Sequence, residues 1–151
     1  MRWIFINISL VEVSKSNWEE CLALSVLERQ KDFVAPNYES ILISKFEENC
    51  YPLCIYNGGT MVGFLMYDID ADTKRWELSR MMIDKRFQGN GYGKEALRIL
   101  LELISRVIGN VDFYTSTAPE NADMKHLISG QGFVPTGEIM WDEEVFVLRR
   151  I

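Results

Sequence analysis

The sequence contains little cysteine, little histidine and no long apolar run. Its three cysteines form an odd set and its only histidine is His126, so neither a disulfide framework nor a histidine-rich metal site is expected. Cys50 and Cys54 with His126 could supply three metal ligands, but no second ligand cluster accompanies them, which favours buried thiols. No apolar stretch approaches the roughly 20 residues that a membrane-spanning helix needs. We therefore expect a cytoplasmic protein without a metal.

Positive charge is scarce as well. The chain has 16 Lys and Arg against 22 Asp and Glu, which gives a net charge of -6. Because binding to phosphates needs a basic face, this balance argues against nucleic acid as a partner. It is compatible with a cationic or neutral small molecule. The 151 residues and the apolar share of 48% are ordinary for one globular domain.

Hydrophobic patterning predicts seven strands and four helices. Strands are expected over residues 4–13, 53–56, 61–67, 75–83, 111–117, 133–141 and 145–148. The first segment alternates as a strand does, so it is not interpreted as a signal peptide. The order is β-α-α-β-β-β-α-β-α-β-β, with antiparallel hairpins before a parallel β-α-β unit. We predict a mixed α/β fold, a mostly antiparallel seven-stranded sheet with helices on both faces, as a single domain over residues 1–151.

Local signals set the expected ends of the helices. Ser16 and Glu19 form a capping box, so the first helix is expected to begin there and to run to about Gln30. Asn37 is expected to cap the second helix. The third and longest helix follows a glycine loop, and its apolar residues recur at the helical period. The fourth covers residues 121–129.

The most informative segment is this glycine loop, between a predicted strand and the longest predicted helix. It reads Gln88-Gly89-Asn90-Gly91-Tyr92-Gly93-Lys94. Its glycines let the main chain approach a ligand closely, and the first amides of the helix are unpaired donors at the positive end of the helix dipole. The loop can therefore bind an anion. Its spacing fits neither a Walker loop nor a Rossmann fingerprint.

The loop resembles the Q/R-x-x-G-x-G/A signature of the Gcn5-related N-acetyltransferase (GNAT) superfamily. The order of elements is similar to that superfamily over nearly the whole chain. The segment from Asn121 to Phe133 resembles its last helix and the G-F that follows it. Residues 30–37 resemble the bacterial branch of spermine/spermidine (diamine) acetyltransferases.

This resemblance implies acetyl-CoA as the cofactor. Its pyrophosphate would be held by main-chain amides of Gln88, Gly89, Asn90, Gly91, Tyr92, Gly93 and Lys94. Main-chain groups of Met81, Met82 and Ile83 would pair with the pantetheine arm as an added strand does, and Asn121 would reach the cofactor from the last helix. A bulge in the strand that carries Met82 would leave an amide free to serve as an oxyanion donor.

The sequence departs from its relatives at both usual catalytic side chains. Ser79 stands where polyamine acetyltransferases of this family often carry an acidic base, and Ile128 where many members carry a tyrosine that protonates the thiolate. Glu77 shares a strand face with Ser79 unless a bulge intervenes, so it is the candidate base; a surface carboxylate is the alternative. Glu28 and Asp32 are the candidate acceptor-binding residues, with a solvated helix face as the alternative.

We therefore expect an N-acetyltransferase that moves an acetyl group from acetyl-CoA to a primary amine of a small molecule by direct attack in a ternary complex. Polyamines such as spermidine and spermine are the acceptors that the resemblance implies. A non-catalytic acetyl-CoA sensor and a protein N-acetyltransferase are the alternatives. Final strands like residues 145–147 often build dimers in this superfamily, so a homodimer is compatible with the resemblance. No metal, nucleic acid or membrane partner is expected.

Overall fold

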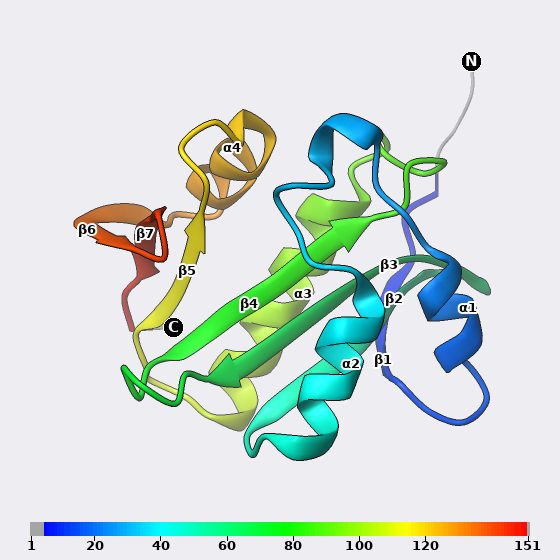
Figure 1. Cartoon of the computed structure of the whole chain (residues 1–151), viewed down its shortest axis with the longest axis horizontal. Helices are drawn as coiled ribbons and strands as arrows, with labels where there is room; N and C mark the ends of the chain where they lie inside the picture. The colour runs from blue at the N-terminus through cyan, green and yellow to red at the C-terminus, as the bar shows by residue number, and fades with distance from the viewer. Residues whose placement is uncertain (1–4, 151) are drawn as a thin grey trace.

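A computed structural model describes residues 5–150 as one sheet covered by helices (Figure 1). The strands lie in the order β1-β2-β3-β4-β5-β7-β6. They are β1 (Ile8–Glu12), β2 (Cys50–Asn57), β3 (Thr60–Ile69), β4 (Trp76–Ile83), β5 (Phe113–Thr117), β6 (Val134–Met140) and β7 (Glu143–Leu148). The helices are α1 (Trp18–Ala23), α2 (Asn37–Phe46), α3 (Tyr92–Val107) and α4 (Ala122–Gly130), and a 3₁₀ turn spans Glu28–Gln30.

The predicted mixed, mostly antiparallel sheet is confirmed. Neighbouring strands pair antiparallel except β4 and β5, which are parallel and joined through α3. The predicted first strand began at residue 4, which lies outside the described residues; the observed β1 begins at Ile8. None of the helices described within residues 5–150 is long and apolar enough to cross a membrane.

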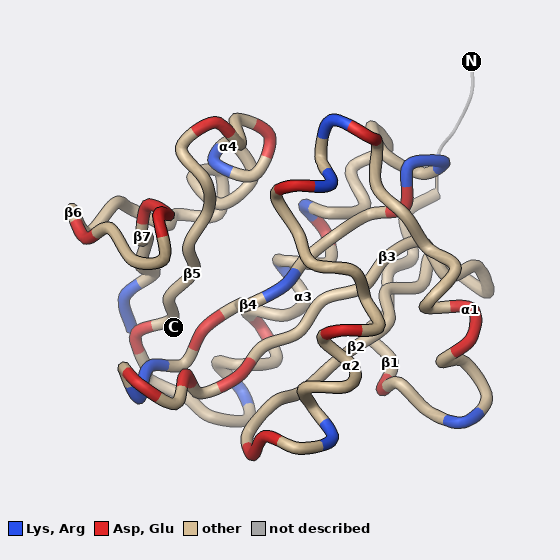
Figure 2. The backbone as a smooth tube through the Cα atoms, viewed as in Figure 1, with Lys and Arg blue, Asp and Glu red and all other residues tan. Residues whose placement is uncertain are grey.

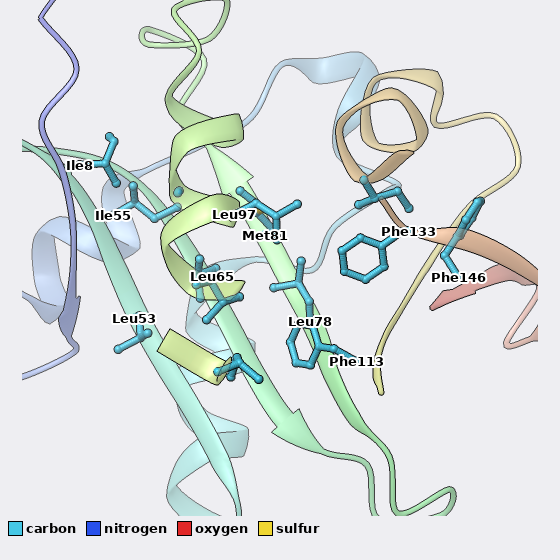
Figure 3. Packing of buried hydrophobic residues seen from close by; sticks show 14 of the residues in the cluster. Ile8, Leu53, Ile55, Leu65, Leu78, Met81, Leu97, Phe113, Phe133 and Phe146 are labelled. Atoms are coloured by element: carbon cyan, nitrogen blue, oxygen red, sulfur yellow. The ribbon is translucent and has the colours of Figure 1, made fainter. Parts of the chain in front are cut away.

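Two core clusters hold the helices on the two faces of the sheet. On one face α3 contributes the fully buried residues Ala96, Leu97, Leu100 and Ile104. Figure 3 shows Leu97 beside Leu65 and Met81 of the sheet, with Phe133 under α4. On the other face α1 and α2 cover a smaller cluster around Cys54 and Phe64. Burying each such apolar side chain stabilises the fold by roughly 1.5–3 kcal/mol.

The first helix is much shorter than predicted, since α1 ends at Ala23 rather than near Gln30. The chain leaves the helical path because the main chain of Ser25 bonds to the loop after β4. Its N–H donates to Oδ2 of Asp84 at 2.9 Å, and its carbonyl oxygen accepts from the N–H of Lys85 at 2.8 Å. Ser25 and Asp84 are 59 positions apart, so no local pattern predicts this break. The contacts bring the segment after α1 beside the glycine loop.

Both predicted helix caps are wrong. The capping box of Ser16 does not form, and α1 has no side-chain cap. Asn37 is the first residue inside α2, after Pro36, and not its cap. The side-chain amide of Asn37 is buried and donates to the carbonyl oxygen of Cys21 at 3.0 Å. Asn37 therefore joins α2 to α1.

A β-bulge interrupts β4 at Ser79. Tyr67 of β3 lies opposite Leu78, but the next residue back along β3, Met66, lies opposite Arg80. Ser79 is therefore the extra residue on the bulged strand, and a bulge of this kind bends the strand and leaves main-chain groups unpaired. The simple alternation that would place Glu77 and Ser79 on one face does not continue through it.

The bulge coincides with the point where β4 and β5 separate. Their parallel pairing ends at Leu78, opposite Thr115. Beyond it the two strands diverge, with α4 beside one and the 3₁₀ turn beside the other (Figure 1). The main-chain edge of residues 79–83 that faces away from β3 is consequently available to a ligand.

Candidate active site

A cavity of about 490 Å³ lies where β4 and β5 diverge. One wall is the end of β4, residues 78–83, and the opposite wall is the end of β5, residues 115–117, with the start of α4. The glycine loop closes one end, and residues 29–30 and 33–35 of the segment between α1 and α2 form the rim. Most of the residues predicted to hold the cofactor therefore surround a single space.

The glycine loop is folded as an anion site. Gly89 and Gly91 both have φ of +82°, a left-handed conformation that glycine adopts without strain. Gly91 is the residue before α3, and Gly91, Tyr92 and Gly93 line the cavity. The 16-residue α3 therefore directs its unpaired first amides and the positive end of its dipole into the space.

The side chains of this loop hold its shape. Nε2 of Gln88 donates to the carbonyl oxygen of Ile83 and to Oε1 of Gln30, each at 2.9 Å, and Gln30 donates back at 3.1 Å. Nδ2 of Asn90 donates to the carbonyl oxygen of Phe87 at 2.9 Å. Gln88 thus fastens the loop to the end of β4 and to the 3₁₀ turn. Lys94 and Asn90, which the sequence also predicted at the pyrophosphate, do not line the cavity.

The residues predicted along the pantetheine arm line the cavity. Met81, Met82 and Ile83 form its β4 wall, past the last pair with β5. An extended ligand can add to such an unpaired strand edge by main-chain hydrogen bonds. Asn121 lies on the opposite wall, where its Oδ1 accepts from the N–H of Met124 at 3.2 Å and so caps α4.

The predicted acceptor-binding carboxylates lie outside the cavity lining. Glu28 pairs with Lys31 at 2.6 Å, and this ammonium group lowers the pKa of the Glu28 carboxyl. Neither Glu28 nor Asp32 contributes to the wall. Their segment presents Arg29 and the apolar Phe33 instead, because the turn after α1 rotates the acidic side chains outward.

Glu77 also lies outside the cavity, in a shallow depression beside it. Asp68 lies directly opposite on β3. Figure 2 shows acidic positions, in red, on both of these neighbouring strands. Burial, and then the charge of Asp68, raise the pKa of Glu77 to about 8. The depression shares Thr115 and Ser116 with the cavity. The role of Glu77 as the base stays a prediction. With a pKa of about 8, the Glu77 carboxyl group keeps its proton at neutral pH.

Four charged residues of the cavity wall were missed by the sequence analysis: besides Arg29 and Asp123, they are Arg80 and Glu143. Arg80 follows the bulge, and its guanidinium donates to the carbonyl oxygen of Ser79 at 2.8 Å. Glu143 is the first residue of β7, and its Oε1 accepts from Oγ of Ser116 at 2.9 Å. Glu143 was interpreted as a turn residue. The sequence does carry a signal for this position. Val147 and Val145 are alternate residues of β7, and the next residue in that alternation is Glu143.

The position of the expected tyrosine also differs. Ile128 is fully buried in the α3-side core and does not line the cavity. The α4 side chains that line the cavity are Asp123, which pairs with Arg29, and the apolar Met124 and Leu127, so none of them supplies a hydroxyl in place of the expected tyrosine. A tyrosine at position 128 would have to enter a filled core. The isoleucine that replaces the expected tyrosine is therefore a core-packing residue here.

The sequence matches known proteins over nearly its full length. Residues 12–133 match the model of the acetyltransferase (GNAT) family. The spermine/spermidine N(1)-acetyltransferase of Bacillus subtilis (strain 168) is 27% identical over 152 residues, covering 97% of this chain and 100% of that protein.

Solved structures with 14–15% identity show the same fold. A domain from Methanocaldococcus jannaschii DSM 2661 superposes with a TM-score of 0.76 and 15% identity, covering 96% of this chain and 99% of that one. The spermidine N-acetyltransferase from Vibrio cholerae, in complex with CoA and spermine, gives a TM-score of 0.71 and 14% identity, covering 93% and 92%.

Proposed function

Because the chain belongs to the acetyltransferase (GNAT) family, we propose that it transfers the acetyl group of acetyl-CoA to a primary amine of a small polyamine such as spermidine or spermine. The observation that carries the proposal is the cavity at the divergence of β4 and β5, which ends on an anion-binding loop. The relative from Bacillus subtilis, named for spermine and spermidine, supports the acceptor class.

The donor occupies the cavity from the glycine loop inward. Main-chain amides between Gln88 and Gly93 hold the pyrophosphate, and the pantetheine arm extends along Met81 to Ile83 as an added strand. Asn121 contacts the cofactor from α4. The acetyl group then lies near the bulge at Ser79, where an unpaired main-chain N–H can stabilise the oxyanion of the tetrahedral intermediate.

The acceptor amine must lose a proton before it attacks. An alkyl amine resembles lysine, with a pKa of about 10.4, so the neutral form costs ~4 kcal/mol at neutral pH. The leaving thiol resembles cysteine, with a pKa of about 8.5, and departs more easily as thiolate. A group that receives the proton therefore matters more than an acid, which agrees with an α4 wall where Asp123 pairs with Arg29 and the other lining residues, Met124 and Leu127, are apolar.

The acceptor class predicts a rate order. Spermidine or spermine should release CoA thiol faster than glycine or lysine, because the chain carries a net charge of -6 and attracts polycations. They should also react faster than an aminoglycoside, which is a polycation too, because the Bacillus subtilis relative is named for spermine and spermidine. Added salt should raise the KM for the polyamine, since charge attraction between exposed groups is screened. Steady-state thiol release across this panel measures both effects. A neutral or acidic best acceptor would contradict the polyamine assignment but not acetyl transfer.

The proposal extends to a homodimer in the cytoplasm. The predicted dimer strand, residues 145–147, lies buried inside the sheet between β5 and β6, so it cannot form the interface. β6 is the edge strand on this side of the sheet, and its Val134 and Ile139 are exposed, as is Trp141 after it. Three free thiols suit a reducing compartment.

Sedimentation equilibrium tests the dimer. The wild-type protein should have a molar mass of twice 17.5 kDa, and the Trp141→Glu variant should have 17.5 kDa. A wild-type monomer would refute the dimer.

A further inference from the structure

The carboxylate of Glu143 faces the cavity from β7, the strand beside β5. Glu143 opens β7 and Ser116 lies near the end of β5; these strands pair antiparallel with Ser116 opposite Val145. Since alternate residues of a strand share a face, Glu143 projects on the same side as Val145 and Ser116. The bond from Oγ of Ser116 to Oε1 of Glu143, 2.9 Å long, fixes the carboxylate in the wall.

The charges around the cavity leave this carboxylate without a basic partner. Four charged side chains line the space: Arg29, Arg80, Asp123 and Glu143. Arg29 of the 3₁₀ turn pairs with Asp123 of α4 at 3.4 Å, and the charge of Arg80 acts on Asp68 and Glu77 behind the bulge. Among residues 5–150, no Lys, Arg or His nitrogen lies within 4.0 Å of the Glu143 carboxylate. A cation supplied by a ligand would give the Glu143 carboxylate a partner of opposite charge.

We propose that Glu143 binds the attacking ammonium group of the acceptor and receives the proton that this group must lose, with Ser116 as its positioning residue. The inference rests on the proposed acetyl transfer and assigns one end of that site. Glu143 is suited to the task because it is inside the cavity, whereas Glu77 lies in the neighbouring depression, opposite the acidic Asp68.

The proton and electron changes balance as follows. The ammonium gives one proton to the Glu143 carboxylate, which becomes a carboxylic acid. The freed nitrogen lone pair forms the N–C bond at the acetyl carbonyl, and collapse of the tetrahedral intermediate breaks the C–S bond, with its electron pair leaving on sulfur. A second proton from the nitrogen neutralises the thiolate, and Glu143 returns its proton to water.

Glu143→Gln and Glu144→Gln form a matched test. The two residues are adjacent, and both changes remove one negative charge. Glu144 pairs with Lys125 at 2.9 Å and does not line the cavity. We expect Glu143→Gln to lower kcat/KM for spermidine at pH 7 by on the order of 10²–10³, within the range for general base catalysis. Glu144→Gln should stay within about threefold of wild type, and calorimetric affinity for acetyl-CoA should be unchanged in both.

The pH profile separates proton transfer from a structural effect. Near pH 10 about three in ten amine groups are already neutral, against fewer than one in a thousand at pH 7, so the deficit of Glu143→Gln should shrink severalfold. Equal losses in Glu143→Gln and Glu144→Gln, a loss that is the same at every pH, or no loss would overturn the proposal. A larger loss in Glu77→Gln than in Glu143→Gln would transfer the role to Glu77.

A second pair of variants keeps the test independent of folding. If Glu143→Gln no longer binds acetyl-CoA, Glu143→Asp is compared with Glu143→Ala, because only the former keeps a carboxylate. At neutral pH Glu143→Asp should retain about tenfold more activity, and equal activities would overturn the proposal. Wild-type protein that releases no thiol with any amine would refute the proposed function itself, whereas wild-type turnover that Glu143→Gln retains would refute only the role of Glu143.

Discussion

Replacing Gly91 with aspartate should abolish measurable acetyl-CoA binding while the fold stays intact. Gly91 has φ of +82° at the start of α3, and a Cβ there would lie 3.4 Å from Cδ1 of Ile6. The new carboxylate would stand in the proposed pyrophosphate site, so it would repel the ligand and occupy the first helical amides. We expect an affinity loss on the order of 100-fold or more, which corresponds to about 2.8 kcal/mol or more.

Gly58→Asp is the control for this change. Gly58 also has a positive φ, of +59°, but lies in the β2–β3 hairpin with nothing within 4 Å of a Cβ. Both variants introduce the same charge and the same left-handed aspartate, a residue type that tolerates this conformation better than most. Calorimetry should show lost affinity in Gly91→Asp alone, with native circular dichroism in both. Equal affinities would refute the pyrophosphate site.

The Glu77→Gln variant should lose much less unfolding free energy than the wild-type protein when the pH rises into the alkaline range. Glu77 lies directly opposite Asp68, and like charges in such a pair destabilise a sheet. Burial and the charge of Asp68 raise the pKa of Glu77 from 4.5 to about 8. The folded protein therefore keeps a proton that the unfolded chain releases above pH 4.5, and this stabilisation is lost as pH rises through about 8.

Urea unfolding at pH 6 and pH 9 measures this effect. Wild-type protein should lose roughly 1–2 kcal/mol of unfolding free energy between these pH values, because about two pKa units lie in this interval and the partial exposure of the Glu77 side chain weakens the effect. Glu77→Gln should lose much less, because glutamine stays neutral and can donate to the Asp68 carboxylate. Glu19→Gln on exposed α1 serves as the control and should behave like wild type. Parallel pH dependence in all three proteins would contradict a shared proton.

The donor end of the site was predictable because its signals are local. Gly89 and Gly91 adopt the positive φ that their spacing suggests, and the apolar period of residues 96–104 sets the face of α3 that packs on the sheet. Strand order followed from hairpin signals and from the right-handed β-α-β connection. These features depend on residues that are near one another in the sequence.

The acceptor end was not predictable because it depends on contacts between distant segments. The bulge at Ser79 exists only in the pairing with β3, and it removes Glu77 from the face where alternation placed it. The bonds of Ser25 to the loop after β4 end α1 early and turn Glu28 outward. Glu143 enters the wall because β7 begins at Glu143, two residues before the predicted strand of residues 145–148.

The most direct test of acetyl transfer compares thiol release with product formation in one reaction. Wild-type protein, acetyl-CoA and spermidine are mixed at neutral pH, and free CoA thiol and acetylated spermidine are quantified together by colorimetry and mass spectrometry. The proposed function predicts equal molar amounts of the two products, formed only when protein and amine are both present. Tight acetyl-CoA binding with no amine-dependent thiol release would contradict catalysis and favour a protein that only senses the cofactor.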